Sequence, residues 1–163
     1  SVAQSSMKAS APCVLIIALL PVISMALHFT EISLPASHAA LTDLFDWLAG
    51  QAARLGIPAA ELLRLQLIAE ELFINTVDHG FAGKTGPDVC IALARDGATI
   101  HVRYRDAAPA FDPCNMPFPQ DSEALGGMGL PLVRGLSRAF SYRREGDWNE
   151  IRLQLAAESG TEA

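Results

Sequence analysis

The sequence has little cysteine and no zinc-binding pattern. Its only cysteines, Cys13, Cys90 and Cys114, are far apart and odd in number. They therefore form neither a disulfide framework nor a CxxC metal pair, and a reducing, cytoplasmic location is the natural interpretation. The four histidines are scattered without HExxH or Cys/His spacing, so a structural zinc site has little support.

Positive charge is also scarce. Twelve lysines and arginines stand against 18 aspartates and glutamates, which gives a formal net charge of −6. No cluster of basic residues is present, so the chain lacks the electrostatic footprint of a protein that binds nucleic acid directly.

Half of the residues are hydrophobic, whereas disorder needs low hydrophobicity and high net charge. The 163 residues therefore predict a packed core and one domain.

The first 25 residues are predicted to be an apolar extension whose structure the sequence leaves open. Residues 11–27 read APCVLIIALLPVISMAL, and residues 9–30 carry no Asp, Glu, Lys or Arg. The segment could lie outside the core, with Met25 as the original start, or pack against the domain or a partner. It could also be a membrane anchor or the apolar part of a signal peptide. Pro21 and the short length argue against a spanning helix.

Residues 26–157 are predicted to form the domain, followed by a short tail at 158–163. The expected order is a strand (27–34), two helices (37–55 and 58–80), a hairpin (89–93 and 99–104), a long loop (107–126), a short helix (128–138) and a second hairpin (139–144 and 150–155). Ser37 is expected to cap the first helix and Gly56 to end it, while Asp96-Gly97 marks a turn. This order favours an α/β two-layer sandwich (α+β) with a mixed, mostly antiparallel sheet and helices on one face.

The second predicted helix carries the first candidate site. Glu71, Asn75 and His79 are spaced i, i+4 and i+8, so they share one face of the helix. A carboxylate and an amide one turn apart can position a water or hydroxyl and a hard metal ion such as Mg²⁺, which prefers oxygen ligands. The alternative interpretation is a solvated polar face whose terminal histidine interacts with the helix dipole.

Two further elements follow along the chain. Asp106 ends a predicted strand and begins the run DAAPAFDP, and an aspartate facing a pocket there can accept a hydrogen bond from an exocyclic amine such as that of adenine. Residues 126–130 read GGMGL before the short helix, where backbone N–H groups and the helix dipole can hold phosphate. Taken singly, the aspartate can simply end a strand and the glycines can form a hinge. Gly83-Lys84-Thr85 imitates the end of a Walker A loop, but Asp78 replaces the required glycine and a strand follows.

In this order the three elements resemble the N, G1 and G2 boxes of the GHKL ATPases (Bergerat fold). The short stand-alone form resembles the anti-sigma-factor serine kinases, over about residues 27–155. The resemblance implies that Glu71 is the general base toward a protein serine hydroxyl, that Asn75 binds Mg²⁺ and that Asp106 accepts the adenine amine. The other implied nucleotide contacts are His79, Ala108, Phe111, Gly127, Met128, Gly129 and Leu130, with residues 107–126 as the ATP lid.

The function implied by the resemblance is that of an anti-sigma factor with ATP- and Mg²⁺-dependent protein-serine kinase activity. It would phosphorylate an anti-anti-sigma (STAS-type) protein and regulate transcription by sequestering a sigma factor, as a cytoplasmic homodimer without a membrane partner.

One departure from the G1 pattern suggests an alternative. The pattern reads Asp-x-Gly-x-Gly, and both glycine positions are alanine here, Ala108 and Ala110. If Ala108 needed a positive φ or a close approach to the base, its methyl group would cost on the order of 1 kcal/mol or more. The alternative is therefore a catalytically weak or inactive binding module that sequesters a regulatory partner. A membrane-tethered regulator, suggested by residues 11–27, is a third hypothesis.

Overall fold

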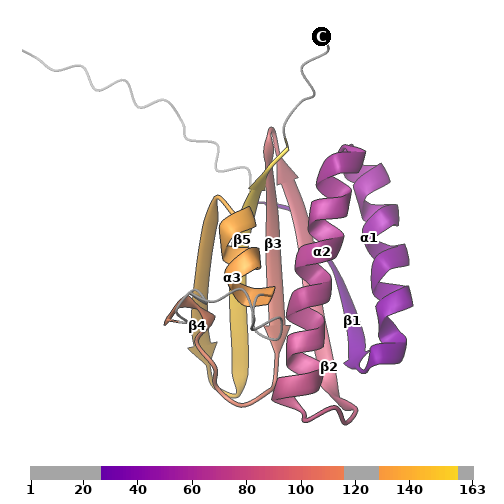
Figure 1. The fold of residues 1–163 in the computed structure, drawn as a ribbon. Helices are drawn as coiled ribbons and strands as arrows, with labels where there is room; N and C mark the ends of the chain where they lie inside the picture. Colours follow the sequence, from indigo (N-terminus) through magenta and orange to yellow (C-terminus); the bar gives the residue numbers. More distant parts are fainter. Residues whose placement is uncertain (1–26, 116–128, 158–163) are drawn as a thin grey trace, which may run out of the picture.

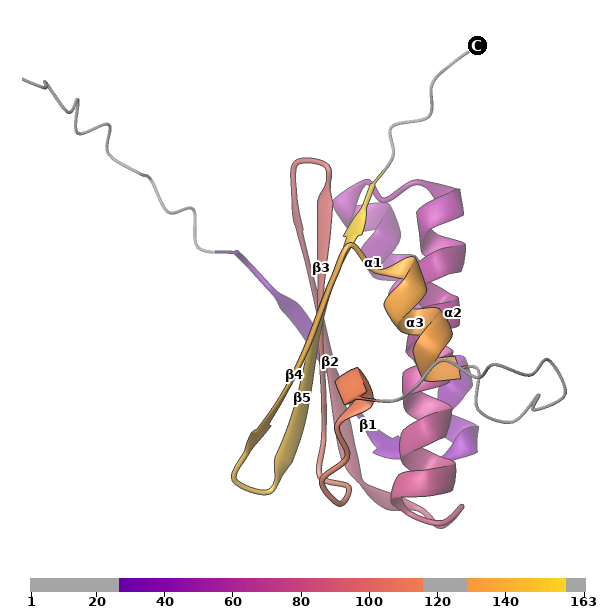
Figure 2. The same ribbon diagram turned by 60° about the vertical axis from the view of Figure 1, so that its left-hand side comes forward.

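A twisted five-stranded sheet forms one layer of the described structure and helices form the other (Figures 1 and 2). The computed structural model describes residues 27–115 and 129–157. Along the chain these residues form β1 (Thr30–Ala36), α1 (Leu41–Leu55), α2 (Ala59–Asn75), β2 (Gly86–Asp96), β3 (Thr99–Asp106), α3 (Gly129–Leu136), β4 (Ala139–Glu145) and β5 (Trp148–Ala156). Short 3₁₀ turns lie at His38–Ala40 and Pro113–Asn115.

The strand order in the sheet is β1-β2-β3-β5-β4. All four pairings are antiparallel, so the predicted α+β class is confirmed and the sheet is more uniform than the mixed sheet that the sequence predicted. The last strand, β5, lies between β3 and β4. This placement sets Asp106, the final residue of β3, directly opposite Asn149 near the start of β5.

The core lies between the sheet and the helices. Along β3, alternate residues are buried on the helix side, including Ile100, Val102 and Tyr104. They pack in one hydrophobic cluster with buried residues of the helices such as Leu48 and Phe73. This alternation is the period-2 pattern of a strand with one covered face, and it fixes which side of each strand meets the helices.

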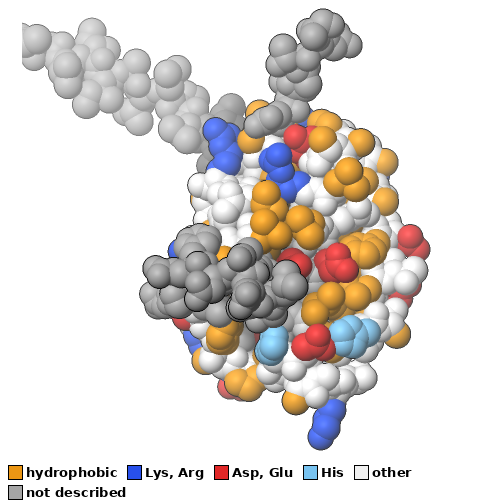
Figure 3. Space-filling view, in the orientation of Figure 1, with side chains coloured by type: hydrophobic (Ala, Val, Ile, Leu, Met, Phe, Trp, Pro, Cys, Tyr) orange, Lys and Arg blue, Asp and Glu red, His pale blue; other side chains and the backbone are white. Residues whose placement is uncertain are grey.

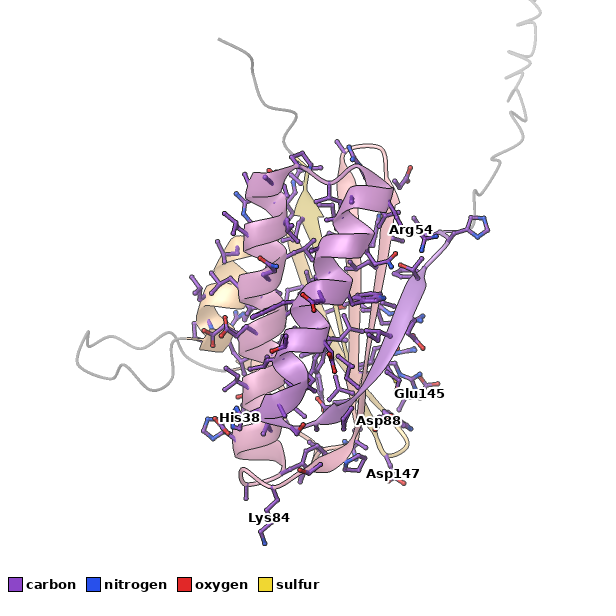
Figure 4. The ribbon with its side chains drawn as sticks, turned by 90° about the vertical axis from the view of Figure 1, so that its right-hand side faces the viewer. His38, Arg54, Lys84, Asp88, Glu145 and Asp147 are labelled. Carbon is purple, nitrogen blue, oxygen red and sulfur yellow. The ribbon has the colours of Figure 1, made fainter. Side chains whose placement is uncertain are left out.

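The sheet face away from the helices carries ion pairs. Glu150 is only 4% exposed and accepts hydrogen bonds from Arg143 at 2.8 Å and Arg152 at 2.6 Å. Glu145, which Figure 4 shows beyond the sheet on the side away from the helices, pairs with Arg143 at 2.8 Å. Burial by itself raises the pKa of Glu150, but the hydrogen bonds and charges of the two arginines together lower it below its ordinary value.

The first helical segment begins after Ser37 as predicted, but its first turn, His38–Ala40, is 3₁₀ and α1 itself begins at Leu41. A 3₁₀ turn precedes α1, and the Ser37 side chain makes no capping hydrogen bond. The predicted end is confirmed, because Gly56 has a φ of +64° and the N–H of Ile57 bonds to the carbonyl of Ala52. Arg95 of β2 adds a second cap by donating to the carbonyl of Leu55 at 3.0 Å.

The second helix ends at the predicted residue 80, but its last turn is not α-helical. After Asn75 the chain forms a π-helical turn, Thr76–Gly80, in which the N–H of Phe81 donates to the carbonyl of Thr76 at 3.0 Å. A hydrogen bond between residues five apart widens the turn, a feature often found at functional sites. The same turn supplies several side chains of the site described below.

The remaining boundaries differ by a few residues. β1 continues through Pro35 to Ala36 with a register shift, which is tolerated because β1 is an edge strand. The first hairpin turns as predicted, with Gly97 at a φ of +54°. Residues 1–26, 116–128 and 158–163, and so the predicted extension, part of the lid and the tail, lie outside the described residues. Among the described helices, none combines the length and apolar character needed to cross a membrane.

Candidate active site

A cavity of about 700 Å³ opens between α2, the start of α3 and the sheet. This volume lies in the range of small-molecule sites. Ten residues were predicted for the site, and eight of them line this cavity: Glu71, Asn75, His79, Asp106, Ala108, Phe111, Gly129 and Leu130. The other two, Gly127 and Met128, lie outside the described residues. On this face of the molecule, acidic side chains lie among hydrophobic ones, with histidine side chains close by (Figure 3).

The helix α2 and the π-helical turn after it form one wall. Glu71, Asn75 and His79 all reach the cavity, as their shared helical face predicted. The Glu71 carboxylate lies against the backbone of Gly129, so that a side chain at position 129 would collide with it. The carboxylate thus sits beside the first residue of α3, where the partial positive charge of a helix N-terminus favours an anion.

Asp106 ends β3 at another wall of the cavity and is 6% exposed. Its Oδ1 accepts hydrogen bonds from the backbone N–H of Ala108 at 2.9 Å and from Asn149 Nδ2 at 2.8 Å. Its Oδ2 accepts one from the Thr76 hydroxyl at 3.1 Å. A buried carboxylate needs such donors, because burial of an unpaired charge is very costly. The result is a rigidly held hydrogen-bond acceptor.

The buried hydroxyl groups of Tyr104 and Thr76 form a hydrogen-bond chain that ends at Asp106. The Tyr104 hydroxyl lies 2.6 Å from Thr76 Oγ1 and 3.2 Å from the carbonyl of Leu72. Burial, and secondly the charge of Asp106, raise the pKa of Tyr104 well above its ordinary value. The phenol therefore stays protonated and can donate to Thr76 Oγ1 or to the Leu72 carbonyl. The hydroxyl of Thr76 lies 3.1 Å from Asp106 Oδ2 and 3.1 Å from the same carbonyl, so both acceptors are within its reach.

Asn149 is a site residue that the sequence analysis missed. It lines the cavity from β5, and besides Asp106 its Nδ2 donates to the carbonyl of Ala108 at 3.1 Å. Its Oδ1 accepts from the hydroxyl of Tyr142 and from Arg144, both at 2.9 Å. No local motif marks this asparagine, since its role depends on the pairing of β3 with β5.

The two alanines in place of glycines adopt ordinary backbone conformations. Among the described non-glycine residues, only Ala82 has a positive φ, so the positive-φ strain considered for Ala108 does not arise. The Ala108 methyl group is accommodated by a glycine across from it. A Cβ added to Gly80 would lie only 2.7 Å from the Cβ of Ala108.

The cavity therefore has two chemically different regions. One presents the fixed acceptor Asp106, and the other presents the carboxylate of Glu71 and the amide of Asn75 beside the start of α3. Within the described ranges, no three or more His, Cys, Asp or Glu residues are grouped as a metal site. A magnesium ion that is bound by one or two protein oxygens and by phosphates does not need such a group.

Comparison with known proteins identifies the class to which this fold and cavity belong. Residues 34–155 match the family of histidine kinase-like ATPase domains, and the chain belongs to this family. The resemblance carried by the three sequence elements is thereby confirmed.

Two known proteins are similar to this chain, one in sequence and one in fold. The chain is 30% identical over 128 residues to the serine/threonine-protein kinase BtrW of Bordetella bronchiseptica, covering 76% of this chain and 89% of BtrW. A crystal structure of the RsbU and RsbW domains of Rv1364c from Mycobacterium tuberculosis has a similar fold, with a TM-score of 0.57 and 17% identity. That match covers 78% of this chain but only 31% of the other, and at this identity it shows the fold alone. The chain is thus a kinase-like ATPase domain related to BtrW.

Proposed function

We propose that this chain binds ATP with Mg²⁺ in the cavity and transfers the γ-phosphoryl group to a serine of a partner protein. One observation carries the proposal. A fixed acceptor for a base, Asp106, and a carboxylate–amide pair beside a helix N-terminus, Glu71 and Asn75, line the same cavity. The family is one of kinase-like ATPase domains, and the relative BtrW is named as a serine/threonine-protein kinase.

Asp106 is proposed to recognise the adenine base. Its carboxylate accepts hydrogen bonds and cannot donate while ionised, so it suits an exocyclic amine. Ala108 and Phe111 line the cavity next along the chain and are proposed to contact the nucleotide. Residues 107–126 are proposed to form the lid.

The phosphate groups are proposed to lie at the start of α3. Gly129, Leu130 and, before them, Gly127 and Met128 would offer backbone N–H groups there, and the helix dipole favours an anion. Asn75 is proposed to hold Mg²⁺, which neutralises charge on the phosphates when bound. Glu71 and Asn75 carry side-chain oxygen atoms that can ligate Mg²⁺, and they lie one helical turn apart on the cavity wall. The residues present therefore fit this ion.

Glu71 is proposed to act as the general base. Its carboxylate would accept the proton of the substrate serine hydroxyl as the serine oxygen bonds to the γ-phosphorus and ADP leaves. For this, the carboxylate must turn from Gly129 toward the incoming hydroxyl. His79, at the end of the same face, is proposed to support the nucleotide site.

The substrate and partner form the finer part of the proposal. The order of the three sequence elements resembles that of anti-sigma-factor serine kinases. On this basis the phosphorylated serine belongs to a STAS-type anti-anti-sigma protein, and residues 26–157 form a cytoplasmic domain that sequesters a sigma factor as a homodimer. The sequestered factor would thereby be withheld from transcription.

Phosphoryl transfer is tested with ATP labelled on the γ-phosphate and a STAS-type protein from the same organism. The wild-type protein should label the partner, and E71Q should lower the rate by about 10²- to 10⁴-fold, the usual contribution of a general base. Glu70 is the matched control, because it precedes Glu71 on α2 but does not line the cavity. E70Q should label at the wild-type rate. An equal loss in E70Q, or no transfer by the wild type in a complex that forms, contradicts kinase activity.

The alternative is a binding module that keeps the fold without catalysis, and the observation that favours it is that Ala108 and Ala110 line the cavity where the G1 pattern has glycines. Titration with Mg-ATP separates the two functions, because a ligand that binds only the folded state raises the melting temperature. A rise with ligand concentration supports the ATP-binding proposal. An unchanged melting temperature supports the module.

A further inference from the structure

The orientation of the Asn149 side-chain amide is determined by its neighbours. Arg144 has only donors, and it lies 2.9 Å from Asn149 Oδ1. Asp106 and the carbonyl of Ala108 offer acceptors, and both lie within hydrogen-bond distance of Nδ2. Exchanging the oxygen and nitrogen of the amide would place a donor against a donor and acceptors against acceptors. The hydrogen-bond network therefore allows a single orientation.

This orientation determines what Asp106 can still accept. Each carboxylate oxygen accepts about two hydrogen bonds. Oδ1 already has two donors, the N–H of Ala108 and the amide of Asn149, whereas Oδ2 has one, the Thr76 hydroxyl. Oδ2 thus retains the accepting capacity for one more donor. Because Asp106 lines the cavity, that donor is expected to belong to a ligand.

We propose that Asn149 is a positioning residue that makes the cavity prefer a purine with an exocyclic amine to one with a carbonyl at the same position. Arg144 is a second positioning residue, which acts by holding Asn149. The inference rests on the proposed function, because it takes a purine nucleotide as the ligand. It adds residues of β4 and β5 to a site whose sequence elements all precede these strands.

The reason is geometric. The Asn149 side-chain amide donates hydrogen bonds to both the Asp106 carboxylate and the carbonyl of Ala108. It therefore helps to fix the rotation of the carboxylate relative to the chain that follows β3. Arg144 donates to the same Ala108 carbonyl at 2.8 Å. Without the amide, only the Ala108 N–H and the Thr76 hydroxyl hold the carboxylate, and Oδ1 gains a second open accepting position. The open accepting positions then no longer point at one place in the cavity. An amine then loses its advantage over a carbonyl.

Dissociation constants for ATP and for inosine triphosphate provide the test, since the inosine base has a carbonyl in place of the exocyclic amine and a proton on the adjacent ring nitrogen. Wild-type protein should bind ATP at least about tenfold more tightly, the effect of one hydrogen bond to a charged group. N149A should lose most of this ratio, chiefly through weaker ATP binding. Gln154 is the matched control, an exposed amide on the same strand, and Q154A should keep the wild-type ratio.

If Asn149 had a purely structural role, N149A would weaken the binding of both nucleotides equally and leave the ratio of their dissociation constants unchanged. This result would overturn the inference. So does an N149A protein with the wild-type ratio and affinity. Arg144 is exposed, so R144A tests the same ratio even where N149A does not fold, and the ratio should fall in the same direction. An unchanged ratio in folded R144A counts against the inference. Wild-type protein that binds neither nucleotide rejects the proposed function itself, and the inference with it.

Discussion

The contact between Gly80 and Ala108 offers a quantitative prediction. Replacing Gly80 by alanine would place its Cβ 2.7 Å from the Cβ of Ala108, closer than real Cβ atoms come. The Ala108 side is not free to move away, because its N–H is bound by Asp106 and its carbonyl by Arg144 and Asn149. Overpacking of this kind costs about 1–3 kcal/mol. We expect G80A to lower the free energy of unfolding by that amount.

The double variant G80A/A108G should recover most of the loss. Without the Ala108 methyl group, a Cβ at position 80 meets only ordinary contacts, with Thr76 Cγ2 at 3.8 Å and the Ala108 Cα at 4.0 Å. Gly80 does not have a positive φ, so alanine is conformationally acceptable there. A108G alone should cost about 1–2 kcal/mol, from a lost buried methyl and a more flexible unfolded chain. The two changes should therefore be coupled by at least about 1 kcal/mol.

Urea unfolding of the four proteins measures the coupling. For a chain of this size, 1 kcal/mol corresponds to a shift of about 2–4 °C in melting temperature, so thermal unfolding gives a second measurement. Gly50 is the matched control, because nothing lies within 4 Å of its added Cβ in the middle of α1. G50A should stabilise the protein by about 0.5–1 kcal/mol. A G80A protein as stable as wild type, or changes that simply add in the double variant, would refute the reasoning.

Three further predictions concern the hydrogen bonds, ion pairs and metal of the site and sheet. T76V removes the hydroxyl shared by Tyr104 and Asp106 and should cost about 1–3 kcal/mol in urea unfolding, whereas T76S, which keeps the hydroxyl, should lose clearly less. Since the pKa of Glu150 is lowered in the folded protein, its contribution to stability is present above the ordinary glutamate pKa and is lost as the pH falls through the lower folded value. The free energy of unfolding should therefore fall less steeply in E150Q than in wild type below about pH 5, and parallel curves would contradict this. Removing Mg²⁺ with a chelator should leave the melting temperature without nucleotide unchanged but reduce the rise caused by ATP, and a chelator-induced fall without nucleotide would indicate a structural metal instead.

The helices, the turns and much of the cavity wall could be predicted from the sequence, because they depend on local patterns. Helical spacing alone placed Glu71 and Asn75 on one face, and Gly56 ended a helix through its conformational freedom. The assignment of Asp106 to the same cavity came from the resemblance, and the structure does place it there. The helical segment ends at Gly80 as predicted, but the spacing did not reveal that its last turn, Thr76–Gly80, is π-helical. In that turn the Thr76 hydroxyl bonds to the distant Tyr104 and Asp106.

Contacts between distant segments were decided only in the tertiary structure. Asn149 meets Asp106 because β5 pairs with β3 as well as with β4, its hairpin partner, and a hairpin pattern does not reveal that second pairing. Likewise, the alanine at position 108 looked like a source of strain, whereas its methyl group fits against Gly80, 28 residues earlier in the chain. Spacing along the chain determines which residues share a face of an element. Which faces then meet depends on packing the whole sheet against its helices.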